Sequence, residues 1–373
     1  MTSASTSASH RGTRRSLLCA GLVMLAACGG GSDNSASSDM GYVATSLVSD
    51  VNASSNPYSS SNVDAHLVNP WGIAFNPQGF VWVANNATST STLYDGNGVA
   101  QSLVVAIPAG TAGPAKPTGI VFSATQSFQV VQGGVSGASR FIFAGEAGTI
   151  AGWAPNVNLT NAITVFDGAT AGKIYKGLAI GSQAGADRLF AADFHNGAVD
   201  VFDANFAPIV AAGGFVDASL PAGYAPFGIQ VIGNLVYVAY AKQDAAQEDE
   251  VKGAGLGIVN TFDLSGNLVK RLVPAGGKLN APWGIALAPA NFGLFSNALL
   301  IANFGDGRIN AYDATTGASL GTLATPAGAP IAIDGLWGIA FGNGINGQPT
   351  NTLFYAAGPA DETHGVYGRI DSR

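Results

Sequence analysis

Short apolar runs separated by glycine, asparagine, aspartate and proline make up most of the chain after residue 40. In one stretch, such runs occupy 71–75, 80–85, 91–95 and 101–107. A later stretch repeats the plan, with runs at 283–287, 298–303, 308–313 and 319–323. The lengths and the turn residues between the runs are typical of β-strands, and no helical periodicity interrupts them. The pattern therefore predicts repeated units of four short strands.

A Trp-Gly-Ile sequence opens three of these units, and degenerate copies of it open three more. The glycine of this motif recurs as Gly72, Gly119, Gly177, Gly228, Gly284 and Gly338, at intervals of 47 to 58 residues. Self-similarity at a period near fifty residues, with four strands in each copy, is typical of a β-propeller. The sequence therefore predicts an all-β, six-bladed propeller of four-stranded blades over residues 41–373.

The last unit lacks a strand, because only a few residues follow the run Val366–Ile370 before the chain stops at Arg373. The segment Tyr42–Val48 precedes the first unit and is similar to other fourth strands, such as Ser319–Leu323. We expect this N-terminal strand to complete the last blade, which closes the ring and removes an exposed edge.

Two recurring aromatic features carry structural expectations. The third strand of four units ends in an aromatic–Asp pair: Tyr94-Asp95, Phe202-Asp203, Phe262-Asp263 and Tyr312-Asp313. The aromatic ring should pack between blades, and the aspartate should cap the following turn. Trp71, Trp283 and Trp337 begin the first strand of their units and either line the mouth of the channel or wedge adjacent blades together. The wedge is our expectation.

The Pro-x-Gly-Ile-Ala opening and the aromatic–Asp ending resemble NHL-repeat propellers. The pieces Asn69–Ala74, Ala84–Asn86 and Ala302–Phe304 look more narrowly like a family of exported bacterial NHL-like propeller proteins. The resemblance covers residues 41–371 and implies the six-bladed fold. Related six-bladed folds include calcium-dependent lactonases and peptidyl-amide lyases, but this chain does not match the catalytic pattern of either.

The N-terminus has the features of an export signal in residues 1–27. Arg11, Arg14 and Arg15 precede an apolar run that is too short to span a bilayer as a helix. Leu25-Ala26-Ala27-Cys28 resembles a bacterial lipobox, which predicts lipidation of Cys28; an ordinary secretory signal is the alternative. Residues 28–40 then form a glycine- and serine-rich tether. The basic head also resembles a twin-arginine signal, so general secretion and twin-arginine export both stay open.

The expected location follows from this signal. Gly29 after the cysteine favours the outer membrane of a Gram-negative host, facing either the periplasm or the cell surface. Removing the signal takes away three basic residues, so the mature net charge is near 13 − 23 = −10. A strongly acidic chain argues against nucleic-acid binding, which needs a basic patch. We expect a monomer that meets the membrane only through its lipid anchor.

Ligands of propellers usually bind at one mouth of the channel, formed by the loops before the first strand and those between the second and third strands. These loops hold the three histidines of the mature chain together with several amides and carboxylates. The candidate binding residues are His66, Asn69, Asn85, Glu146, Asp193, His195, Asn303, Asp306, Asp334 and His364. Oxygen ligands of this kind suit Ca²⁺ or Mg²⁺ and imidazole suits Zn²⁺, so a divalent metal is a candidate cofactor.

The charged insert 242–252 has four carboxylates but lacks the spacing and turn glycine of an EF-hand, so we expect a solvated, mobile loop. No serine-hydrolase elbow, zinc-protease motif or P-loop occurs in the sequence, and no catalytic residue is assigned. The leading hypothesis is an envelope-tethered binding or scaffold module for a protein, peptide or glycan. The alternatives are a metal-dependent, lactonase-like hydrolase or lyase at the same mouth and, on fold alone, a quinone-dependent electron-transfer protein.

Overall fold

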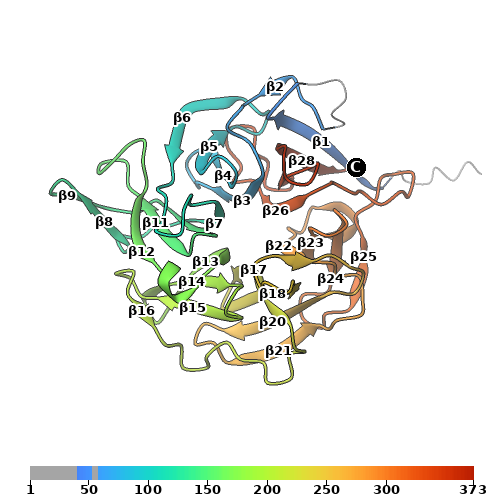
Figure 1. The fold of residues 1–373 in the computed structure, drawn as a ribbon. Helices are drawn as coiled ribbons and strands as arrows, with labels where there is room; N and C mark the ends of the chain where they lie inside the picture. The colour runs from blue at the N-terminus through green and yellow to red at the C-terminus, as the bar shows by residue number, and fades with distance from the viewer. Residues whose placement is uncertain (1–39, 53–57) are drawn as a thin grey trace, which may run out of the picture. The chain divides into compact units, whose positions relative to one another are not determined.

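The computed structural model describes residues 40–52 and 58–373, which form six antiparallel sheets arranged around a central axis (Figure 1). The expected signal, Cys28 and nearly all of the tether lie outside the described residues. The first strand of each blade lies next to the axis, and the later strands follow outward. The six-bladed, four-stranded propeller predicted from the repeat is confirmed.

The blades use the following strands, given from the axis outward. Blade one contains β3 (Pro70–Phe75), β4 (Val81–Asn85), β5 (Thr90–Tyr94) and β6 (Ala100–Ala106). Blade two contains β7 (Pro117–Phe122), β10 (Phe141–Gly145), β11 (Thr149–Trp153) and β12 (Ile163–Asp167). Blade three contains β13 (Tyr175–Gln183), β14 (Ala186–Asp193), β15 (Ala198–Phe202) and β16 (Pro208–Ile209). Blade four contains β17 (Tyr224–Ile232), β18 (Leu235–Gln243), β20 (Gly257–Asp263) and β21 (Leu268–Val273). Blade five contains β22 (Pro282–Leu287), β23 (Leu299–Asn303), β24 (Ile309–Tyr312) and β25 (Ser319–Thr322). Blade six contains β26 (Leu336–Phe341), β27 (Leu353–Ala357), β28 (Val366–Ser372) and β1 (Tyr42–Ser49).

A few short strands and helical turns lie outside the four-stranded blades. Blade two carries a hairpin of β8 (Gln129–Gln132) and β9 (Val135–Ala138), which projects from the ring in Figure 1. The two-residue strand β2 (Asn62–Val63) pairs with β1, and β19 (Glu250–Val251) pairs with β18. Two single-turn 3₁₀ helices, η1 (Ala169–Ala171) and η2 (Gly293–Phe295), lie in loops.

The ring is closed by β1, which pairs antiparallel with β28 from Tyr42 opposite Ser372 to Ser49 opposite Val366. The N-terminal strand is therefore the fourth strand of blade six, as predicted. Tyr42 is fully buried, and its hydroxyl donates to the carbonyl of Phe292 at 2.9 Å. Because Phe292 belongs to the loop after β22, this bond also ties the closing strand to blade five.

The repeated glycines lie where adjacent blades touch at the axis. A Cβ atom on Gly228 would lie 1.9 Å from the carbonyl oxygen of Trp283 in the next blade. The same approach closes the circle, because a Cβ on Gly338 of blade six would lie 2.4 Å from the carbonyl oxygen of Trp71 in blade one. The glycine of the motif is therefore required by the close contact of main chains rather than by a turn.

The aromatic–Asp pairs have the roles predicted for them. Tyr94, Phe202, Phe262 and Tyr312 are buried, and the following aspartates each accept backbone N–H groups of the next turn. These hydrogen bonds favour the ionised carboxylate, so the pKa of Asp313 is lowered chiefly by the N–H of Thr316. The pairs thus hold the turn between the third and fourth strands and leave no free carboxylate there for chemistry.

Candidate functional site

Going round the six blades, the residues before the repeated glycines are Trp71, Thr118, Lys176, Phe227, Trp283 and Trp337. The four aromatic members form one buried cluster at the axis, and the ammonium of Lys176 lies over the Trp71 ring. The ring centres of Trp71 and Trp337 lie 3.4 Å apart in a stacked arrangement, and Trp283 meets Trp71 edge-on at 5.9 Å. The stacked Trp71 and Trp337 do join adjacent blades, as expected, but the contacts of Trp71 with Trp283 and Phe227 also cross the axis. Their position beside the axial glycine turns the indoles toward one another, and they plug the channel.

Lys176 is the exception in this aromatic plug. Its side chain is 1% exposed, and its Nζ lies 5.3 Å from the ring centre of Trp71. The ammonium pairs with Glu146 Oε1 at 2.5 Å and with Asp249 Oδ1 at 2.9 Å. Asp249 belongs to the charged insert of blade four, so that insert is not simply a solvated loop. Its Asp249 carboxylate is the second counter-ion of the buried ammonium.

Amide side chains extend this ion pair across the mouth of the channel. Asn86 donates from Nδ2 to Glu146 Oε2 at 3.0 Å, and Asn69 donates from Nδ2 to Glu362 Oε2 at 2.6 Å. Asn69 also donates weakly to Asn86 Oδ1 at 3.4 Å and accepts the indole N–H of Trp337 at 3.1 Å. We call Asn69, Asn86, Glu146, Lys176, Asp249, Glu250 and Glu362 the mouth network. It joins blades one, two, three, four and six over the aromatic plug.

The electrostatics of the mouth network set the protonation of its members. Burial lowers the pKa of Lys176, but the charges of Glu146, Asp249 and Glu250 outweigh this effect and raise it overall. Burial raises the pKa of Glu250 to about 7, although the charge of Lys176 acts in the opposite direction. Burial also raises the pKa of Glu362, against the hydrogen bond that Asn69 donates. The lysine is therefore a fixed cation, whereas Glu250 titrates near neutral pH.

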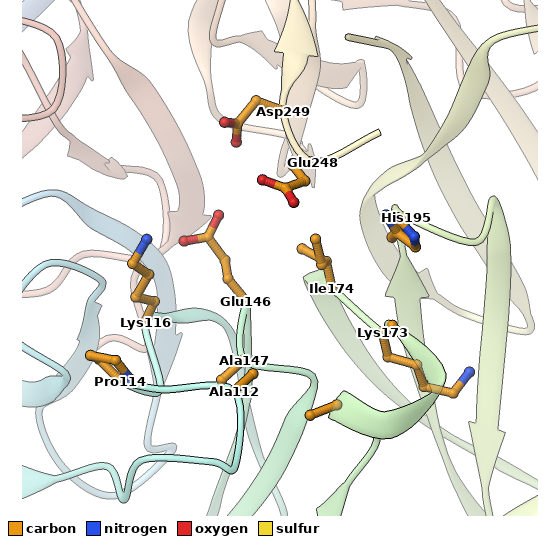
Figure 2. Close-up of a pocket in the computed structure, with 12 residues that line it drawn as sticks. Ala112, Pro114, Lys116, Glu146, Ala147, Lys173, Ile174, His195, Glu248 and Asp249 are labelled. Carbon is orange, nitrogen blue, oxygen red and sulfur yellow. The ribbon is translucent and has the colours of Figure 1, made fainter. Parts of the chain in front are cut away.

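A basin of about 450 Å³ opens beside this network, over blades two, three and four (Figure 2). Lys116, Glu146, His195, Glu248 and Asp249 line it together with apolar groups such as Ile174. Lys173 also lines the basin, but its ammonium is bound to Asp193 at 3.1 Å and Asp200 at 2.6 Å. The volume is in the range of small-ligand sites.

The predicted candidates divide between this site and the scaffold. Asn69 and Glu146 belong to the mouth network, and His195 lines the basin. Asn85, Asp193 and Asn303 are fully buried and hold neighbouring strands and loops by hydrogen bonds. Asp306 and Asp334 accept backbone N–H groups from Arg308 and Ala360. His66 pairs with Asp64 at 2.9 Å, and His364 pairs with Asp50 at 2.8 Å.

The three histidines therefore have separate local surroundings. Within residues 40–52 and 58–373, no group of three or more His, Cys, Asp or Glu side chains is placed to hold a metal ion. The same part of the chain contains no helix with the length and apolar character needed to cross a bilayer.

The candidates predicted from the sequence did not include five members of the mouth network: Asn86, Lys176, Asp249, Glu250 and Glu362. One signal was available, because Lys176 occupies the repeat position that holds an aromatic residue in four of the six copies. A lysine at such a place needs buried carboxylates. Which carboxylates would meet it depends on the path of the blade-four insert and of the loop before β28, and the repeat does not specify either.

Glu250 predicts a pH dependence of stability. Because its folded pKa of about 7 lies above its ordinary value, the folded state binds more protons between these two values. The free energy of unfolding should therefore fall as the pH rises from about 5 to about 7. Allowing for partial exposure, we expect a loss of about 2 kcal/mol. Urea unfolding at pH 5.0 and 7.5 measures it. Glu250→Gln should flatten the curve, whereas the exposed neighbour Glu248→Gln should leave it unchanged; equal slopes in all three proteins would refute the assignment.

Comparison with known proteins identifies relatives by sequence. The chain is 34% identical over 321 residues to uncharacterized protein R648 of Acanthamoeba polyphaga mimivirus, covering 83% of this chain and 76% of the relative. It is 31% identical over 319 residues to uncharacterized protein L690 of the same virus, covering 83% and 82%. No protein-family profile matches the sequence.

Solved structures share the fold at low identity. A Bacteroides thetaiotaomicron protein of unknown function has a TM-score of 0.54 at 13% identity, covering 89% of this chain and 76% of that one. A glucose dehydrogenase has a TM-score of 0.50 at 13% identity, with 88% and 98% covered. Virginiamycin B lyase from Staphylococcus aureus has a TM-score of 0.47 at 14% identity, with 89% and 99% covered. At such identities the likeness extends to the propeller fold alone. By its sequence, the chain belongs to the same protein family as the mimivirus proteins R648 and L690.

Proposed function

We propose that the protein is a binding module whose basin holds a zwitterionic ligand, such as a short peptide. One observation carries this proposal. Among the described charged side chains that line the basin, Glu146, Asp249 and Lys173 have ion-pair partners, whereas Lys116 and Glu248 have none. These two unpaired charges have opposite sign and come from blade two and blade four. A ligand with both a carboxylate and an ammonium group would satisfy them together.

The basin is preformed on the blade-two side. Lys116 has a left-handed φ of 45°, and the corresponding residues Asn69 and Ala281 of blades one and five have φ of 46° and 44°. This backbone is uncommon outside glycine, and it recurs in three copies directly before the first strand. The carbonyl of Lys116 accepts the side-chain amide of Asn86 at 3.2 Å. The loop that presents the lysine therefore needs little ordering when a ligand binds, which favours affinity.

Binding fits the mouth network better than covalent catalysis does. A lysine must lose its proton to attack a carbonyl group, and such lysines are activated by lowering their pKa. The carboxylates around Lys176 raise the pKa of this amine instead. The network therefore supplies a rigid charged floor beside the basin.

Calorimetry with trialanine and its blocked forms tests the proposal. N-acetylation removes the ammonium group, and C-terminal amidation removes the carboxylate. Each should weaken binding about tenfold or more, the loss expected for one charge-assisted hydrogen bond. Glu248→Gln should abolish the penalty of acetylation, and Lys116→Gln should abolish that of amidation. Lys278→Gln, at an exposed lysine of blade five, is the matched control.

Two results would overturn this function. Equal affinity for free and blocked peptides would remove the role of the two charges. Mass spectrometry of the same mixtures provides the other test, since cleavage of trialanine would make the protein a hydrolase. For the metal-dependent alternative, Ca²⁺, Mg²⁺ or Zn²⁺ would have to raise the melting temperature of chelator-treated protein.

We further propose that this module is an exported lipoprotein, anchored by Cys28 and acting as a monomer at the cell envelope. The proposal is supported by the basic head, the apolar run and the sequence Leu25-Ala26-Ala27-Cys28. In a Gram-negative expression host, globomycin should cause the precursor to accumulate, and labelled palmitate should enter the wild type but not Cys28→Ala. Unchanged processing in globomycin would contradict the anchor.

A further inference from the structure

A second hollow of about 600 Å³ lies between blades one and two, at the ends of their strands away from the channel mouth. The turn 76–80 after β3 forms one side, and Phe122, Ala124 and Arg140 of blade two form the other. It shares no lining residue with the basin of Figure 2. Its volume is that of a site for a small organic molecule.

Aromatic side chains form the inner wall. Trp82 stacks on Phe141 with ring centres 4.1 Å apart, and Trp153 lies 4.6 Å from Trp82. Phe122 meets Phe141 edge-on at 5.4 Å. The indole N–H of Trp153 is already bonded to the carbonyl of Leu159 at 3.0 Å, so this ring presents carbon to the hollow. Such a wall favours a flat or otherwise apolar ligand body.

The rim of the hollow is fixed before any ligand arrives. Asn343 of blade six donates from Nδ2 to the carbonyl of Asn76 at 2.7 Å and to that of Gly79 at 2.8 Å. Within the turn, the backbone N–H of Gln78 donates to Asn76 Oδ1 at 3.0 Å. These bonds hold the turn open over the aromatic wall, so binding does not need to order it.

Arg140 supplies the charge of this site. It is the one charged residue among the described residues that line the hollow, and it has no carboxylate partner there. The guanidinium makes a long hydrogen bond from Nη1 to the carbonyl of Thr125 at 3.4 Å, which leaves most of its five N–H donors available. The planar fork of guanidinium N–H donors matches the oxygens of an acid group such as a carboxylate or sulfonate, and the apolar wall lies beside it.

We propose that this hollow is a binding site for an organic anion with an aromatic or apolar body, whose acid group pairs with Arg140. The rings of Trp82, Phe141 and Trp153 receive the body of the ligand. This site is independent of the zwitterion basin, so either can fail without the other.

Two fluorescent probes with the same skeleton test the pairing. 8-Anilinonaphthalene-1-sulfonate carries the anion, and N-phenyl-1-naphthylamine lacks it. We expect the sulfonate to bind about tenfold more tightly than the neutral probe, a difference typical of one charged hydrogen bond. Arg140→Gln should remove this preference. Arg188→Gln, at a partly buried arginine of blade three, should keep it.

A blocking variant locates the site without touching the charge. Ala124 lines the hollow and is exposed, so Ala124→Trp should fill the opening without disturbing the core. Loss of sulfonate binding at one site per chain in this variant supports the proposal, and trialanine should not compete. Wild-type affinity in Arg140→Gln, or undiminished binding in Ala124→Trp, would overturn it. Circular dichroism of each variant excludes misfolding as the cause of a loss.

Discussion

Replacing Lys176 by methionine is expected to lower the free energy of unfolding at pH 7.5 by about 3 kcal/mol, the lower end for a broken buried ion pair. Methionine has a similar length and is apolar, so the aromatic plug should still pack. The cost comes from Glu146, whose side chain is 17% exposed and would face the plug without a counter-ion. Asp249 is 71% exposed and should return to water at little cost.

The variant should also change the pH dependence in a defined direction. Without the ammonium, the pKa of Glu250 rises further in the folded state, so protonation of this carboxylate at low pH relieves one unpaired charge. The destabilisation should therefore be largest above pH 7 and smaller at pH 5. Urea unfolding at both pH values measures it.

A double-mutant cycle distinguishes charge from packing. Lys176→Met combined with Glu146→Gln should recover most of the loss, because the second change removes the unpaired charge. Lys116→Met, at the exposed lysine of the basin, should cost less than about 0.5 kcal/mol. If the double variant is as unstable as Lys176→Met alone, the network is not held by this ion pair and its electrostatic description fails.

The architecture could be predicted from the sequence because the same pattern of strand and turn residues recurs in every blade. Alternating strand and turn residues define four strands locally, and the glycine before Ile or Leu marks the contact between blades. The role of the closing strand Tyr42–Ser49 could also be predicted, since the last blade had only three strands and needed a fourth from elsewhere in the chain. The aspartate caps were also predictable, because Asp95 and its counterparts bond to turns that immediately follow them.

The mouth network was much harder to predict from the sequence, since its members are far apart in the chain. Glu146, Lys176, Asp249 and Glu362 come from four blades, and loop lengths decide which of them meet. The polar character of a loop residue did not show whether its side chain belongs to the site or only bonds to the backbone of its own blade. Asn69 and Glu146 reach the network, whereas Asp193 and Asn303 serve the scaffold. His66 pairs with Asp64, two residues before it, and His364 pairs with Asp50, 314 residues away; the count of histidines on one face showed neither pair.

Gly228→Ala is expected to destabilise the fold by at least about 3 kcal/mol, the upper range for overpacking. The new Cβ would lie 1.9 Å from the oxygen and 2.7 Å from the carbon of the Trp283 carbonyl. Both atoms belong to main chain in the next blade, so no side chain can rotate away. Blades four and five must separate, which also pulls Trp283 from its hydrogen bond to the carbonyl of Lys176.

Gly277→Ala is the matched control for this change. A Cβ at Gly277 would meet no atom within 4 Å, and its φ lies outside the left-handed region. By restricting the unfolded chain, this variant should be neutral or stabilise by up to about 1 kcal/mol. Thermal unfolding followed by tryptophan fluorescence compares the two. Gly338→Ala, at the contact between blades six and one, should resemble Gly228→Ala because its Cβ would lie 2.4 Å from the Trp71 carbonyl oxygen. If alanine is tolerated at both axial positions, contact between main chains is not what requires the repeated glycine.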